Sequence, residues 1–169
     1  MNVNLYSFLG LYDKALVTLG AVLDKGAERA KALGVTTADM LEWRLIDDMY
    51  PLRFQAQMVV NFTRQWPARV AGLEPPPGMA EGIDLAGIHA AISDARAYIA
   101  AIRPEQFEGR EDVPVTVKLG DIMEPTLPAA QWLTGFATTN IYFHLSIAYA
   151  ILRARGADLG KRDMFAGGI

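Results

Sequence analysis

The chain has 169 residues, of which 51% are hydrophobic and 21% charged, with a net charge of −3 and no cysteine. This composition is typical of a globular protein, and the lack of cysteine excludes disulfides, thiolate metal ligands and thiol nucleophiles. Acidic and basic residues are interspersed without a basic block, which disfavours nucleic acid as a partner, and the length predicts a single domain over residues 1–169.

The first predicted element is a long amphipathic helix. Apolar residues recur at steps of three and four over residues 5–30, and Gly34 follows as a natural C-terminal stop. A short connector helix comes next, capped by Thr36 or Thr37, and we expect it to end before the Tyr-Pro pair at 50–51.

A second long helix is predicted to start at Pro51, because proline suits the first turn of a helix. Pro67 should kink or interrupt it after Trp66, since proline removes a hydrogen-bond donor. The predicted inner stripe consists of Leu52, Gln55, Val59, Phe62, Trp66 and Val70. The predicted solvent-facing side consists of Arg53, Gln57, Asn61 and Arg64. The proline-rich stretch 74–78 reads as an extended linker within the domain.

A third helix is predicted from an Asp84 cap to the Arg-Pro pair at 103–104. Alternating apolar and polar residues over 113–119, a Gly-Asp turn and residues 122–124 then predict a small β-hairpin.

The last long helix is predicted to run from Pro128 to Arg155, with weak points at Gly135 and at the threonine pair 138–139, and Gly156 ends it. Together these elements predict an all-α protein: an up-down four-helix bundle with a short connector helix and a small β-hairpin before the last long helix.

The last helix carries the main candidate site. His144 and Asn140 lie four residues apart, so they share a helical face with Phe136, Ile147 and Ile151, and we expect this face to be buried. Buried polar side chains need partners, which indicates a pocket or a hydrogen-bond network.

Gln55 is a second polar residue on an otherwise apolar stripe. If the second and last long helices face each other, Gln55, Asn140 and His144 converge, together with the hydroxyl of Tyr142 or Tyr149. We therefore expect His144, Asn140, Gln55 and Tyr142 to bind a small molecule. The alternative is an amide and imidazole network that only fixes how the helices pack.

As a metal site this set is weak, because two carboxamides and one imidazole are poor ligands for a transition metal. A divalent metal such as nickel, zinc or iron is disfavoured, and no cofactor is predicted. His89 lies off the core stripe of its helix and is expected at the surface. The three serines, at positions 7, 93 and 146, lack the surroundings of a catalytic nucleophile.

The last helix is apolar on nearly every side, with Ile141, Leu145, Ala148 and Tyr149 away from the His144 face. Such a helix is either central in its bundle or pressed against another subunit, and no helix is central in a four-helix bundle. We therefore expect a homodimer through the last long helix.

The first residues lack the basic start and long apolar centre of a signal peptide, so we expect mature protein in the cytoplasm. The apolar run at 141–152 spans 12 residues, too few to cross a bilayer, and no membrane partner is expected.

Several segments resemble an uncharacterised bacterial family. They are Asp-Met-Tyr-Pro-Leu at 48–52 with Gln55 and Gln57, Phe-Glu-Gly at 107–109, Asn-x-Tyr-Phe-His at 140–144, and Ala-Tyr-Ala-Ile-Leu-Arg at 148–153. The family is domain of unknown function number nineteen ninety-three, within the DinB-like or YfiT-like metalloenzyme superfamily.

The resemblance implies a four-helix bundle, frequent dimers and, in many members of the superfamily, a divalent metal held by three histidines. One of these lies on the second helix, and two spaced by four lie on the fourth. In this sequence only His144 matches this pattern of histidines, because the positions four residues before and after it hold Asn140 and Ala148.

The resulting interpretation is a DinB-like protein with a degenerate metal site that binds a small molecule around His144. Two alternatives stay open at this point. One is a metal- or thiol-cofactor-dependent transferase or hydrolase, and the other is a purely structural or interaction protein.

Overall fold

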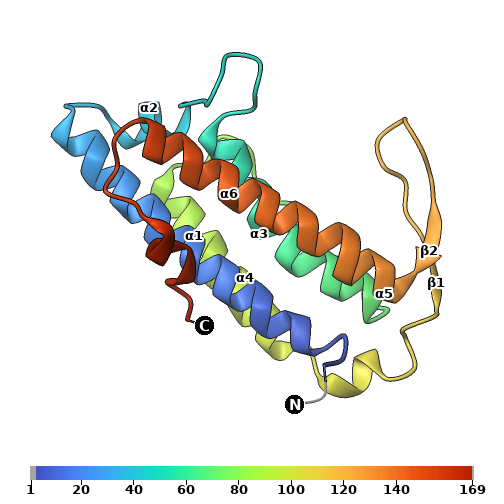
Figure 1. The fold of residues 1–169 in the computed structure, drawn as a ribbon. Helices are drawn as coiled ribbons and strands as arrows, with labels where there is room; N and C mark the ends of the chain where they lie inside the picture. Colours follow the sequence, from blue (N-terminus) through green and yellow to red (C-terminus); the bar gives the residue numbers. More distant parts are fainter. Residues whose placement is uncertain (1–2, 169) are drawn as a thin grey trace.

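Four long helices form the bundle in the computed structural model, which describes residues 3–168 (Figure 1). The helices are α1 (Ser7–Ala32), α3 (Leu52–Val70), α4 (Leu85–Ala101) and α6 (Thr138–Ala154). Both α1 and α3 pack against α4 on one side and against α6 on the other. The predicted all-α bundle is therefore confirmed. Among the described residues, no helix is both long and apolar enough to cross a membrane.

Short elements connect these helices. They are α2 (Thr37–Leu41), the strands β1 (Pro114–Thr116) and β2 (Thr126–Pro128), α5 (Ala129–Gln131), a π-helical segment (Trp132–Ala137), and 3-10 turns at Pro104–Phe107 and Lys161–Phe165. Two predicted caps are present, because the Thr36 hydroxyl accepts a hydrogen bond from the Asp39 amide at 3.1 Å and the Asp84 carboxylate accepts one from the Gly87 amide at 2.8 Å. Gly34 adopts a φ of 68° just beyond α1, which suits a residue without a side chain.

The predicted interruption of α3 at Pro67 is wrong. The helix continues through Pro67 to Val70, and the Ala71 amide still donates to the Pro67 carbonyl at 2.8 Å. Trp66 and Val70 are both buried, so the apolar contacts of this last turn offset the one backbone hydrogen bond that proline removes.

The prediction that Asn61 faces solvent is also wrong. Asn61 is 8% exposed, and its side-chain oxygen accepts a hydrogen bond from the Met79 amide at 2.7 Å. The polar residues beside it donate to carbonyls of the same extended stretch: Gln57 to Met79, Arg64 to Pro77 and Gln65 to Pro76. The spacing of polar residues along a helix does not show whether their side chains face water or a neighbouring backbone whose polar groups lack hydrogen bonds of their own.

The hairpin forms, but its return strand lies later in the chain than predicted. Residues 114–116 pair with 126–128, whereas the predicted return residues make only one isolated bridge, between Leu119 and Met123. The Trp132 indole nitrogen donates to the Val115 carbonyl at 2.8 Å and so fastens the hairpin to the bundle. In Figure 1 the hairpin projects from one end of the molecule.

The last long helix is not continuous. One weak point, Gly135, lies within the π-helical segment that precedes α6. The Leu133 carbonyl in this segment accepts the backbone amide of Thr138 and, in addition, the hydroxyls of Tyr12 at 2.8 Å and Thr138 at 2.9 Å. Tyr12 is fully buried, and its phenol finds partners in this carbonyl and in the Thr138 hydroxyl at 2.9 Å.

Helices α1 and α6 pack closely at Gly26. A Cβ atom on Gly26 would lie 2.6 Å from a methyl carbon of the buried Leu152, whereas one on Gly10 would meet nothing within 4 Å. We expect Gly26→Ala to lower the free energy of unfolding by about 1 kcal/mol, because overpacking outweighs the helix propensity gained. Gly10→Ala should raise it by about 0.5–1 kcal/mol. Urea denaturation of both variants checks this pair, and changes of the same sign would contradict it.

Candidate functional site

The structure brings Gln55 and His144 together between α3 and α6. Gln55 is 3% exposed, and His144 is half-buried on the side of α6 that faces α3. The His144 Nδ1 atom lies 2.8 Å from the Gln55 side-chain oxygen. This contact links two helices whose residues are 89 positions apart in the chain.

The orientation of the Gln55 amide follows from its second hydrogen bond. Its nitrogen donates to the backbone carbonyl of Tyr50 at 3.0 Å, and a carbonyl can only accept. The Gln55 oxygen must therefore accept from His144, so Nδ1 carries a hydrogen. In the neutral ring this tautomer leaves a lone pair on Nε2, to which no group within residues 3–168 hydrogen-bonds.

Burial keeps this imidazole neutral. Desolvation lowers the pKa of His144 below its ordinary value, and no charged group raises it. The ring stands among three phenylalanines, with centroid distances of 5.9 Å to Phe54, 6.2 Å to Phe62 and 5.2 Å to Phe143. At neutral pH the site is thus an uncharged hydrogen-bond acceptor in aromatic surroundings.

Sequence reasoning missed Phe54 and Phe143 as parts of this site. Each directly neighbours a predicted site residue in the sequence, but adjacent residues on a helix point in different directions, so the pattern gave no reason to include them. Phe54 also stacks on Tyr50 at 4.1 Å, and both line an adjoining cleft of about 530 Å³ near Glu81.

Asn140 lies one turn before His144, but it does not join the pair. Its side-chain nitrogen donates to the Phe136 carbonyl of its own helix at 2.8 Å. Because that nitrogen is fixed by a carbonyl, the side-chain oxygen is the free atom, and no hydrogen bond to it occurs in the part of the chain that the structure describes.

Tyr142 lies elsewhere. It lines a different cavity with Leu11 and Thr18 of α1, because residues two apart on a helix point in diverging directions. Of the four residues expected to converge, Gln55 and His144 therefore meet. Asn140 lies near them without a contact, and Tyr142 lies elsewhere. His89 is also separate, since its Nε2 atom lies 3.1 Å from the Asp24 carboxylate between α4 and α1.

The faces of α6 differ in part from what we expected, although Ile151 on the His144 face is fully buried as predicted. Ile141, Leu145 and Ala148 are fully buried in the core of the bundle, so they are not a free surface for a second subunit. His144 is only half-buried, and Phe143 beside it is 54% exposed. A helix with apolar residues on every side does not show by periodicity which of them face the core.

Comparison with known proteins gives two matches. The family model described as "Domain of unknown function (DUF1993)" matches residues 6–165. The crystal structure of a DinB family member protein from Shewanella denitrificans has a TM-score of 0.81 and 26% sequence identity over 96% of this chain and 95% of the other. No curated protein matches the chain.

The lowered pKa of His144 predicts a pH dependence of stability. The folded state binds the imidazole proton more weakly than the unfolded chain does, so stability present above about pH 6.5 is lost as the pH falls. We expect the wild type to lose stability between pH 7 and pH 5 relative to His144→Gln. Urea denaturation across this range measures the difference.

The matched control is His89→Gln, which leaves the Gln55 contact intact and should retain the His144-dependent decline. The interpretation fails if the stability difference between wild type and His144→Gln stays constant across this pH range.

Proposed function

Because the chain belongs to the family described as domain of unknown function (DUF1993) and has a DinB-like fold, we propose that it is a small-molecule-binding protein whose metal site has degenerated to the pair His144 and Gln55. The observation that carries the proposal is the Gln55 amide. It is held by the Tyr50 carbonyl and fixes the hydrogen of His144 on Nδ1, which leaves Nε2 free to accept.

The donor set argues against a divalent metal. The three-histidine site implied by the resemblance requires a histidine on α3 and two spaced by four on α6, but Gln55, Asn140 and Ala148 stand around the single His144. The Gln55 oxygen already accepts from the imidazole. Within residues 3–168, no three His, Cys, Asp or Glu side chains gather where they could hold a metal ion. These residues do not fit the group, and no step through a metal is proposed.

The ligand we propose carries a hydrogen-bond donor on an apolar or aromatic body. His144 Nε2 and the Asn140 side-chain oxygen are both acceptors, one helical turn apart on α6. Phe54, Phe62 and Phe143 supply the apolar contact area around the imidazole. A hydroxyl or amide N–H on a small ring meets both requirements.

One alternative has support of its own. Both ends of the Gln55 amide are used within the fold, so the pair can serve only to fix the packing of α3 against α6. The alternative of a metal- or thiol-cofactor-dependent transferase or hydrolase has less support, because the positions around His144 lack the required ligands.

Phenol and anisole test the proposal, because they differ in one donor hydrogen. In ¹⁵N-labelled protein we expect phenol, but not anisole, to shift the Nε2 resonance of His144 in a saturable way. Gln55→Leu should weaken phenol binding by about threefold to tenfold, since it releases the tautomer that presents the lone pair. Gln57→Leu is the matched control, because Gln57 bonds to Met79 and not to His144.

Stoichiometric nickel, zinc or iron in the purified protein, measured by elemental analysis without added metal or chelator, would contradict the proposal. Equal responses to phenol and anisole would contradict it as well. If Gln55→Leu only lowers stability, by about 1–3 kcal/mol through the imidazole N–H left unpaired, the packing alternative is favoured.

We also propose a homodimer through α6, now by its outer face. Three of the four residues that first suggested this interface lie in the core, whereas Phe143 is 54% exposed and Tyr50 is 63% exposed. Ile46 adds a third exposed apolar side chain, at 55%, in the loop before α3. Exposed apolar side chains of this size are typical of interaction surfaces when they cluster.

Size-exclusion chromatography with light scattering measures the assembly. We expect a dimer mass for the wild type and about tenfold weaker self-association for Phe143→Ser, because aromatic side chains dominate such interfaces. Leu33→Ser, at the end of α1, removes an apolar side chain of similar exposure (46%) and should leave the dimer intact. A monomeric wild type would contradict this proposal without affecting the His144 site.

A further inference from the structure

A second cavity lies on the flank of α6 that faces α1. It measures about 210 Å³ and is bounded by α1, α6 and the C-terminal strap, which we define as residues 157–168. In Figure 1 this strap leaves the end of α6 and returns along α1. Ala15 and Leu145 form apolar walls, and Phe165 of the strap lines the cavity as well.

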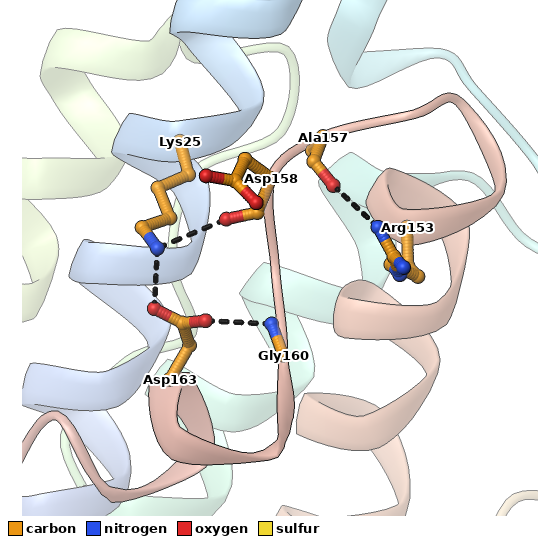
Figure 2. A network of polar contacts seen from close by, with 6 residues as sticks. All are labelled: Lys25, Arg153, Ala157, Asp158, Gly160 and Asp163. Carbon is orange, nitrogen blue, oxygen red and sulfur yellow. Dashed lines mark hydrogen bonds and ion pairs between the residues drawn. The ribbon is translucent and has the colours of Figure 1, made fainter.

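The strap is fastened to α1 by polar contacts at both ends. Figure 2 shows Lys25 donating to the Asp158 carbonyl at 2.9 Å and pairing with the Asp163 carboxylate at 2.6 Å. Nearer the C-terminus, the Gly167 amide donates to the Thr18 hydroxyl at 3.3 Å. A Cβ on Gly167 would lie 2.4 Å from the Lys14 carbonyl oxygen, so only glycine allows this close approach. The cavity is thus a built part of the fold.

At this cavity the Lys14 ammonium and the Tyr142 hydroxyl can each donate a hydrogen bond, whereas the Thr18 hydroxyl accepts one from the Gly167 amide. Within residues 3–168, the polar residues that line the cavity are Lys14, Thr18 and Tyr142, and no acidic residue lines it. Lys14 forms no ion pair within residues 3–168. The Tyr142 hydroxyl has no hydrogen-bond partner in the same range, and burial raises the pKa of Tyr142, which keeps the phenol protonated as a donor.

We infer that this cavity binds a small apolar monocarboxylate of about the size of benzoate. Its carboxylate would pair with Lys14 and accept from Tyr142, and its ring would lie between Ala15, Leu145 and Phe165. The volume fits, because an apolar cavity of about 150 Å³ already accommodates benzene. The inference uses none of the contacts of His144 and stands apart from the function proposed for that site.

Benzoate, benzyl alcohol and benzylamine test the inference, because they share a ring and differ in charge. Isothermal titration calorimetry of the full chain at neutral pH should show saturable binding of one benzoate, weaker binding of benzyl alcohol and no binding of benzylamine. Amide chemical shifts should change around residues 14–18 and in the strap, and not around Phe54 and Phe62.

Two variants locate the polar contacts. Lys14→Met should weaken benzoate binding by about tenfold, because it removes a charge-assisted hydrogen bond, whereas Lys31→Met removes an exposed lysine from the end of α1 and should have no effect. Tyr142→Phe keeps the ring and removes only the hydroxyl, so it should weaken binding by about threefold to tenfold without unfolding the protein.

The inference is overturned if benzylamine binds as well as benzoate, or if no saturable benzoate binding occurs. It is also overturned if both Lys14→Met and Tyr142→Phe bind benzoate like the wild type, since the carboxylate would then contact neither donor.

Discussion

The packing of α6 between α1 and α3 is the constraint on which the rest of the structure depends. Hydrogen bonds join α6 and the turn before it to both of these helices, because buried polar groups need partners. On the α1 side the buried hydroxyl of Tyr12 donates to the Leu133 carbonyl of the π-helical turn. On the α3 side the Gln55 side-chain oxygen accepts a hydrogen bond from the His144 imidazole. Both contacts fix how far α6 can slide or rotate.

The same packing gives the two flanks of α6 opposite hydrogen-bonding characters. Towards α3, the helix presents the free acceptors of His144 and Asn140 among aromatic rings. Towards α1, Tyr142 presents a donor beside Lys14 and Thr18. Tyr142 and His144 are only two positions apart in the sequence, which is enough to turn their side chains towards different neighbours. One helix thereby serves two proposed sites that differ in the chemistry of the ligand each would accept.

Loops without regular structure complete the bundle by using polar residues that look solvent-exposed in the sequence. The proline-rich stretch before α4 has few internal hydrogen bonds of its own, and Asn61, Gln57 and Arg64 of α3 supply them. The C-terminal strap uses Lys25 of α1 in the same way. In each case a polar helical face contacts the backbone of another segment, although periodicity alone would place that face in water. The pattern within one helix contains no information about a segment that packs against it from another part of the chain.

The sequence by itself determined some of the helix limits, because caps such as Thr36 and Asp84 and the stop at Gly34 act within a few residues of the chain. It also indicated that Gln55 and His144 meet, since each interrupts an apolar stripe. Only the tertiary structure decided which face of α6 is buried, why Tyr142 leaves the His144 site, and that Phe54 and Phe143 surround the imidazole. The physical reason is that α6 is apolar on nearly every side, so its orientation is set by the shapes of α1 and α3 and not by its own periodicity.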